Sequence, residues 1–134
     1  KLSDDEKALL DLTNAERAKE KLPPLTANPL LFQAARAHSA NMAKKGEMKH
    51  VLDGKGVEQR LDDVHYDFRK CGENIGWSDG ASLAEIMKGW MDSKAHRDHI
   101  LEPAFTDIGI GVARSDKGEY YYTQVFGVPF EKER

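Results

Sequence analysis

The last third of the chain carries the pattern of a β-hairpin. Ile108, Ile110 and Val112 alternate with small residues, and the run "EYYYTQVFG" that follows is rich in β-branched and aromatic types. Residues 116–118 (DKG) lie between these two runs and have the chemistry of a hairpin turn. We therefore expect two adjacent antiparallel strands here.

Helix boundaries are marked earlier in the chain. A serine followed three residues later by a glutamate occurs at 3–6 and again at 82–85, and this capping-box spacing predicts two helix starts. The proline pair at 23–24 ends the first of these helices. Another helix is predicted from Asn28-Pro29 to Gly46, because the Asn-Pro pair suits a helix start and glycine a helix end.

The segments between these helices complete the predicted architecture. Residues 51–70 contain two glycines and many charges, so we expect a long connection with one short helical turn. The next stretch, "CGENIGW" at 71–77, predicts a strand. Three helices and at least three strands indicate an α+β domain in layers.

Composition narrows the classes of function. The chain has 134 residues, 40% of them hydrophobic, which predicts one domain over residues 1–134, and we expect a monomer. No apolar run approaches the roughly 20 residues that a membrane span needs. The net charge of -3 comes without a basic stripe, which argues against nucleic acid as a partner. Cys71 is the only cysteine, so no intrachain disulfide forms.

Five histidines differ in what their surroundings predict. His38 lies on the apolar face of the second helix, where a lone histidine is usually a hydrogen-bonded core residue. His65 in the charged connection and His99 near a helix end are expected to be solvated or close to helix carbonyls. A zinc site formed by His96 and His99 is weakly supported without a third ligand nearby. His50 and His96 are the candidates for a cleft.

The stretch "WMDSKAHR" places Trp90, Ser93, His96 and Arg97 three or four residues apart. On one continuous helix these residues would lie on the same side, with Trp90 in the core and the other three forming the wall of a cleft. Alternatively, Ser93 and His96 cap the end of the helix and Arg97 pairs with a surface acid. The spacing favours neither interpretation.

Segments in order along nearly the whole chain resemble the CAP superfamily of cysteine-rich secretory, antigen 5 and pathogenesis-related 1 proteins, most closely its compact bacterial branch. They are "TNAER" (13–17), "ARAHSANMA" (35–43), His50, "CGENIGW", "GWMDSKAHRDHIL" (89–101), "FTDIGIGVA" (105–113) and "YYYTQVFG" (120–127). The resemblance implies an α-β-α sandwich with a central antiparallel sheet of three to four strands flanked by helices. It also implies a secreted or otherwise extracytoplasmic location, and a cleft that in many relatives holds two histidines and two glutamates and can bind a divalent metal.

Position by position, this sequence has two of the four cleft residues that the resemblance implies. His50 matches the first cleft histidine and Glu73 the glutamate of "GEN". The second glutamate is replaced by Ser93 and the second histidine by Tyr121, so His96 is the candidate to supply the missing imidazole. The resemblance therefore implies a cleft lined by His50, Glu73, Ser93, His96 and Tyr121.

The remaining matches have structural and open roles. Asn74 and Gln124 match positions that hold strands in place, and with Trp90 and Arg97 they are predicted to support the structure. Glu73 could orient the imidazole of His50, ligate a cation or act as a general base. The sequence does not choose among these three roles.

Three kinds of function are compatible with this pattern. We favour a non-catalytic module that binds a small ligand, a lipid or glycan, or a weakly held divalent cation such as zinc at His50 and His96. The alternative is a hydrolase, either with Ser93, His96 and Glu73 as nucleophile, base and orienting acid, or with a metal at His50, Glu73 and His96. A third interpretation assigns partner contacts to the 51–70 connection.

Overall fold

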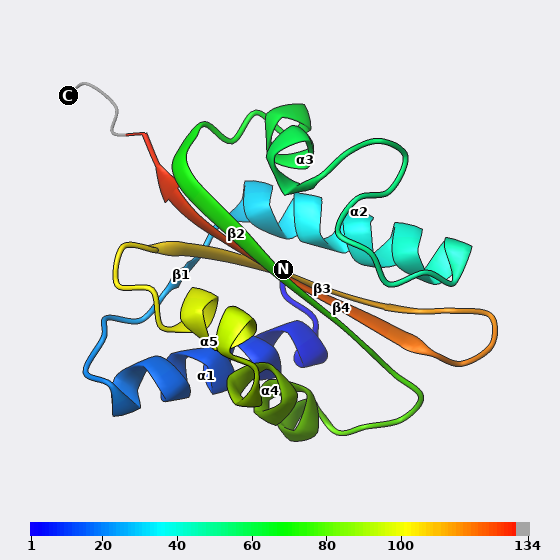
Figure 1. Cartoon of the computed structure of the whole chain (residues 1–134), viewed down its shortest axis with the longest axis horizontal. Helices are drawn as coiled ribbons and strands as arrows, with labels where there is room; N and C mark the ends of the chain where they lie inside the picture. The colour runs from blue at the N-terminus through cyan, green and yellow to red at the C-terminus, as the bar shows by residue number, and fades with distance from the viewer. Residues whose placement is uncertain (131–134) are drawn as a thin grey trace.

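Helices cover both faces of a four-stranded sheet in the computed structural model, which describes residues 1–130 (Figure 1). One face carries α2 and α3, and the other carries α1, α4 and α5. The predicted α+β sandwich is thereby confirmed. In chain order the elements are α1 (Asp4–Lys19), β1 (Thr26–Ala27), α2 (Pro29–Lys45), α3 (Val57–Asp63), β2 (Phe68–Ser78), α4 (Leu83–Asp92), α5 (Lys94–Ile100), β3 (Asp107–Arg114) and β4 (Tyr120–Pro129).

The strands lie in the order β1-β3-β4-β2. β3 and β4 form the predicted hairpin, and β2 pairs antiparallel with the other side of β4. The short strand β1 was not predicted, and it runs parallel to β3. Because successive side chains of a strand point to opposite faces, Glu73 faces the α2 and α3 layer while Asn74 faces α1 and α5.

The predicted helix boundaries are confirmed where local caps define them. Ser3 and Ser82 each accept a hydrogen bond from the backbone N–H of the glutamate three residues on, and the side chain of that glutamate accepts one from the serine backbone N–H. Asn28 caps α2, and Gly46 ends it with a φ of 66° in the left-handed region. No helix among residues 1–130 is both long and apolar enough to cross a bilayer.

Two predicted elements differ from the structure. β2 begins at Phe68 rather than Cys71, so the 51–70 connection is shorter than expected and contains α3. The predicted third helix is broken at Ser93, whose φ of -105° and ψ of 121° are extended. α4 and α5 are therefore separate helices, and Trp90, Ser93 and His96 do not share one continuous helix face.

A buried arginine joins α1 to the end of α5. The side chain of Arg17 is fully buried and donates hydrogen bonds to the carbonyls of Pro23, Ile100 and Glu102, each at 2.9 Å. Burial lowers the pKa of this guanidinium, and the carbonyl oxygens compensate for its lost hydration. This contact fixes the end of α5, and so the helix that carries His96 and His99.

Candidate functional site

The outer edge of β2 is the floor of a cleft between the two helical layers. Figure 1 shows β2 passing between α3 on one side and α4 and α5 on the other. Two cavities lie along this strand. The first, here the tryptophan cavity, has a volume of about 510 Å³ and lies over residues 75–77. The second, the glutamate cavity, has a volume of about 390 Å³ and lies over residues 72–73. His50 lines both of them.

Glu73 and His50 meet in the cleft, as predicted. The Nδ1 atom of His50 lies 2.9 Å from Oε1 of Glu73. Arg60, from α3, donates to both carboxylate oxygens of Glu73 at 3.0 Å, and donates at 2.8 Å to the backbone carbonyl of His50. The Glu73 side chain is only 2% exposed. The bidentate contact with the Arg60 guanidinium therefore supplies the positive charge that a buried carboxylate needs.

His50 is the member of this cluster that a ligand can reach. Its side chain is 55% exposed, whereas that of Glu73 is buried. Because the carboxylate accepts, Nδ1 of His50 carries the proton, and Nε2 is an acceptor when the ring is neutral. Of the three roles open to Glu73, orienting the imidazole of His50 is the one that these contacts support.

The loop that carries His50 is itself held by a histidine. Nε2 of the buried His38 donates to the backbone carbonyl of Lys49 at 2.8 Å, one residue before His50. His38 is thus the hydrogen-bonded core residue that the sequence predicted. Its contact fixes the position of the loop above β2.

Ser93 and His96 pair with one another, but Glu73 does not join them. Oγ of Ser93 lies 2.8 Å from Nδ1 of His96. Both oxygens of Glu73 are held by His50 and Arg60 instead, so the serine, histidine and glutamate relay of the alternative hydrolase interpretation is not assembled. Arg97 donates to the carbonyl of Met91 at 2.9 Å and stabilises the corner between α4 and α5.

Asn74 is part of a buried chain of hydrogen bonds that crosses the sheet. Its amide donates to the side-chain oxygen of Gln124 at 3.2 Å and to the carbonyl of His96 at 3.1 Å. Gln124 in turn donates to Thr13 in α1 at 2.7 Å. These hydrogen bonds connect α1, β4, β2 and α5, which is the structural role predicted for Asn74 and Gln124.

His99 is a cleft residue that the sequence analysis assigned to the surface. Its Nδ1 donates to the Asn74 side chain at 2.9 Å, and its ring packs near Phe105 and Phe126. It lines the glutamate cavity beside Gly72. The break at Ser93 explains the error, because α5 turns His99 towards the sheet instead of continuing the direction of α4.

Tyr121 does not take the place predicted for it. Its ring is buried with Met42, Leu52 and Ile75 on the α2 side of the sheet, and its hydroxyl donates to Glu119 at 3.4 Å. It lines neither of the two cavities along β2. The substitution of tyrosine at this position fills the core on that face with an aromatic ring.

The chain matches the family model described as the cysteine-rich secretory protein family, or CAP, over residues 10–126. It belongs to the CAP family. YlbC, an uncharacterised membrane protein of Bacillus subtilis (strain 168), is 37% identical over 124 residues, which are 90% of this chain and 34% of YlbC. This chain thus spans about a third of that relative.

Solved structures of CAP and SCP domains share the fold. An outer surface protein from Borrelia burgdorferi superposes with a TM-score of 0.88 at 20% identity, over 95% of this chain and 94% of that one. An extracellular protein containing an SCP domain from Bacillus anthracis (str. Ames) superposes with a TM-score of 0.82 at 29% identity, over 92% of this chain and 40% of that one.

The residues of this CAP cleft do not fit a divalent metal. Zinc needs about three protein ligands with free lone pairs. Glu73 already accepts hydrogen bonds from Arg60 on both oxygens, and the guanidinium places a fixed positive charge where a cation would bind. No group of three or more histidine, cysteine, aspartate or glutamate side chains within residues 1–130 is arranged to hold a metal ion.

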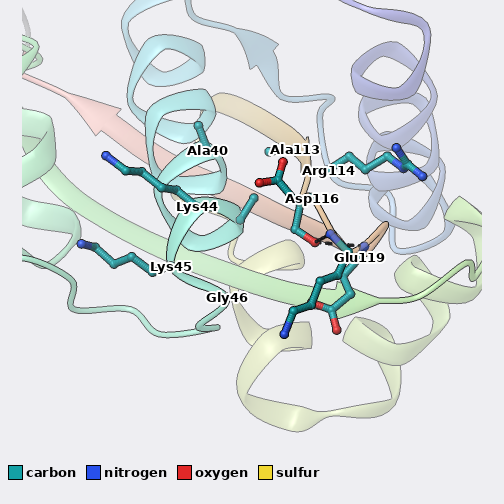
Figure 2. Close-up of a pocket in the computed structure, with 11 residues that line it drawn as sticks. Ala40, Lys44, Lys45, Gly46, Ala113, Arg114, Asp116 and Glu119 are labelled. Carbon is teal, nitrogen blue, oxygen red and sulfur yellow. Dashed lines mark hydrogen bonds between the residues drawn. The ribbon is translucent and has the colours of Figure 1, made fainter.

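A further cavity, of about 500 Å³, lies away from these residues, between the end of α2 and the β3–β4 hairpin (Figure 2). Figure 2 shows the amino groups of Lys44 and Lys45 pointing away from the hairpin and the guanidinium of Arg114 pointing in another direction. Lys45 also pairs with Asp53 at 3.1 Å. The charges around this cavity diverge, so they do not converge on a common ligand.

Acidification is expected to destabilise the fold through its buried histidines. Burial is the main cause that lowers the pKa of His38 and of His99, and the neighbouring His96 lowers the pKa of His99 further. Below the ordinary histidine pKa of about 6.5 the unfolded chain binds more protons than the folded one, so the free energy of unfolding falls as pH falls. Urea unfolding at two pH values, one above and one below about 6.5, measures this. His38→Gln keeps a donor for Lys49 and should reduce the difference, whereas higher stability at the lower pH would contradict the assignment.

Proposed function

We propose that this CAP domain is a non-catalytic binding module whose tryptophan cavity takes an apolar group of a small ligand. The observation that carries the proposal is that apolar side chains and two imidazoles border one cavity. Ile75, Ile86 and Trp90 line it, and His50 and His96 lie at its border. A volume of about 510 Å³ is in the range of small-molecule sites.

The rim of the tryptophan cavity favours an apolar group over a purely polar one. Trp77 and Met48 are 45% and 49% exposed, although both are large apolar side chains. Covering them would gain about 25 cal/mol for each Å² removed from water. A ligand that lies between these two side chains is therefore bound mainly by apolar contact.

The polar groups at the border would orient the ligand. Nε2 of His50 accepts or donates according to the charge of the ring, and Lys49 and His96 add further donors. These side chains come from the loop after α2 and from α5, on opposite sides of the cavity. A ligand with an apolar body and a hydrogen-bonding end suits this arrangement better than a metal ion.

We also infer an extracytoplasmic location. The family description and the similar Bacillus anthracis domain, which is part of an extracellular protein, support this inference.

The absence of the relay among Ser93, His96 and Glu73 supports a binding role over hydrolysis.

Gly89 offers a test of the cavity that leaves the core intact. A Cβ at Gly89 would meet nothing within 4 Å, and the residue lines the tryptophan cavity, so a larger side chain enters open space. We expect Gly89→Leu to fold normally and to lower the affinity for N-acetyl-phenylalaninamide, an apolar probe, by about tenfold or more. Titration followed by tryptophan emission measures this.

The matched control is Gly89→Ala, which leaves most of the cavity free and should retain binding. If Gly89→Leu and the unmodified protein bound N-acetyl-phenylalaninamide with equal affinity, the probe would not bind in the tryptophan cavity. No change of emission with any of the three proteins would remove the proposed apolar site.

A further inference from the structure

We propose that the glutamate cavity binds a primary ammonium group, so that the ligand of the cleft is a small amine whose apolar part fills the tryptophan cavity. The inference rests on the proposed function and names the chemical class of its ligand. His50 and His99 would accept hydrogen bonds from the ammonium through their Nε2 atoms. Glu58, which also lines this cavity, would add a carboxylate.

The Nε2 atom of His99 is an acceptor because the neighbouring side chains fix the ring proton on Nδ1. The Asn74 amide donates to the backbone carbonyl of His96, which can only accept, so the side-chain oxygen of Asn74 faces His99. Nδ1 of His99 therefore donates to that oxygen, at 2.9 Å. The neutral ring then carries a lone pair on Nε2.

The other end of this chain of hydrogen bonds leads to the same assignment. The Thr13 hydroxyl donates to the backbone carbonyl of Leu9 at 2.7 Å, so its oxygen accepts from the Gln124 amide. The side-chain oxygen of Gln124 is then left to accept from the Asn74 amide at 3.2 Å. Two backbone carbonyls, one in α1 and one in α5, thus fix the direction of every hydrogen bond between them.

Nε2 of His99 is open to the glutamate cavity. A Cβ placed on Gly72 would lie 3.1 Å from this atom, and both residues line the cavity. Within residues 1–130, Nε of Arg60 is the one buried side-chain nitrogen or oxygen without a partner, so the unpartnered Nε2 of His99 is reached by solvent. Burial, and then the neighbouring His96 and His50, lower the pKa of His99, which keeps its ring neutral at a pH of about 7.

His50 presents a second acceptor from the opposite helical layer. Its Nδ1 donates to Glu73, so Nε2 is the free nitrogen of a ring that is half exposed. His50 belongs to the loop after α2 and His99 to α5, and both line the glutamate cavity. Two lone pairs of fixed direction therefore border one cavity, and they require a ligand with hydrogen-bond donors.

The charges around the glutamate cavity favour a cation. Glu58 lines it, and no lysine or arginine of residues 1–130 does. The charge of Glu73 is balanced by Arg60, which donates to both carboxylate oxygens. Burial is the main cause that raises the pKa of the Cys71 thiol, beside Gly72, to about 11, and the surrounding carboxylates, Glu58 first, raise it further. Negative charge therefore prevails at this end of the cleft.

An ammonium group matches these acceptors better than a metal ion or a carboxylate does. It combines three N–H donors with one positive charge, and each donor needs a single lone pair. It can therefore bind two imidazoles and a carboxylate while Arg60 keeps both oxygens of Glu73. A carboxylate on the ligand would instead face lone pairs and a like charge.

One ligand can occupy both cavities, because His50 lines both. The glutamate cavity lies over residues 72–73 and the tryptophan cavity over 75–77. At about 3.3 Å for each residue, positions 73 and 76 are roughly 10 Å apart. The flexible chain of 4-phenylbutylamine separates its aryl group from its ammonium by a comparable length, which makes it a suitable probe.

The test compares 4-phenylbutylamine with two analogues by calorimetry at a pH of about 7.5, above the ordinary histidine pKa of about 6.5. (4-Phenylbutyl)trimethylammonium keeps the ring and the charge but has no N–H donor. 5-Phenylpentanoate carries a carboxylate in place of the ammonium. We expect the amine to bind at least about tenfold more tightly than either analogue.

His99→Asn tests the acceptor without removing the buried hydrogen bond. The asparagine amide can donate to Asn74 as Nδ1 does, but the acceptor at Nε2 is lost. We expect the affinity for 4-phenylbutylamine to fall by about fivefold or more and that for the trimethylammonium analogue to stay unchanged. The matched control is His65→Asn, at an exposed histidine outside both cavities, which should change neither affinity. An equal loss for both ligands in His99→Asn would overturn the role of Nε2.

Nitrogen-15 NMR spectra of the imidazole rings provide the second readout. In the free protein we expect His99 and His50 to carry their protons on Nδ1, and 4-phenylbutylamine should shift the Nε2 resonances of both. A proton on Nε2 of His99 in the free protein would overturn the proposal.

Three further results would also overturn the ammonium site. If the amine and both analogues bind equally, only the apolar site of the proposed function remains. If 5-phenylpentanoate binds most tightly, the cavity takes an anion. If N-acetyl-lysine-methylamide binds more tightly than 4-phenylbutylamine, the ammonium is that of a lysine in a protein partner. If neither these ligands nor N-acetyl-phenylalaninamide bind, the proposed function fails as well.

Discussion

Gly109→Ala and Gly111→Ala are each expected to lower the free energy of unfolding by about 3 kcal/mol, at the upper end of the cost of overpacking. A Cβ at Gly109 would lie 2.1 Å from the carbonyl carbon of Leu31, and one at Gly111 would lie 2.3 Å from the carbonyl oxygen of Ala35. Both obstacles are backbone atoms of α2, so no side chain can rotate to make room. The helix would have to move away from the sheet.

Gly89→Ala is the control for these substitutions, because its Cβ meets nothing within 4 Å and it lies inside α4. Alanine there should raise stability by about 0.5 to 1 kcal/mol through helix propensity. Urea unfolding of the three variants gives the comparison. If Gly109→Ala were as stable as the unmodified protein, α2 could not lie against β3 as closely as described.

Arg60→Met is expected to destabilise the fold by about 3 kcal/mol or more, the cost of leaving a buried charge without its partner. The substitution removes both hydrogen bonds from the guanidinium to the Glu73 carboxylate and the bond to the carbonyl of His50. Glu73 would keep only His50, which is half exposed. The loop that carries His50 should lose order along with its anchor.

The matched control is Lys55→Met, which removes an ion pair to Asp63 whose side chains are both 52% exposed. Such surface pairs contribute at most about 1 kcal/mol. Adding Glu73→Gln to Arg60→Met should recover part of the loss, because the neutral amide no longer needs a cation. Equal effects of Arg60→Met and Lys55→Met in urea unfolding would show that Arg60 does not hold the cleft together.

Local signals made most of the fold predictable. The caps at Ser3, Asn28 and Ser82 depend on residues within three positions, and the structure has helices at all three. The alternation at 108–112 predicted a strand, but it did not explain why glycine occupies the positions that face α2, 109 and 111. That reason is the closeness of α2, which belongs to a distant part of the chain.

Only those residues of the site that match the family pattern could be predicted from the sequence. The resemblance brought His50 and Glu73 together, whereas Arg60 was missed because nothing local links it to a carboxylate thirteen residues later. The break at Ser93 had no proline or glycine to mark it, so the directions of His96 and His99 could not be derived from helical spacing. Long-range packing decided these features.

The central claim is that an apolar group binds between Trp77 and Trp90 beside His50, and amide NMR spectra recorded during a titration with N-acetyl-phenylalaninamide test it most directly. We predict the largest shifts at the Trp90 indole N–H and at the Gly76 and Gly89 amides, which border the tryptophan cavity. Resonances of Lys44 and Asp116, at the other cavity, should stay unchanged. Shifts confined to that second group, or none at Trp90 at saturating probe, would contradict the account.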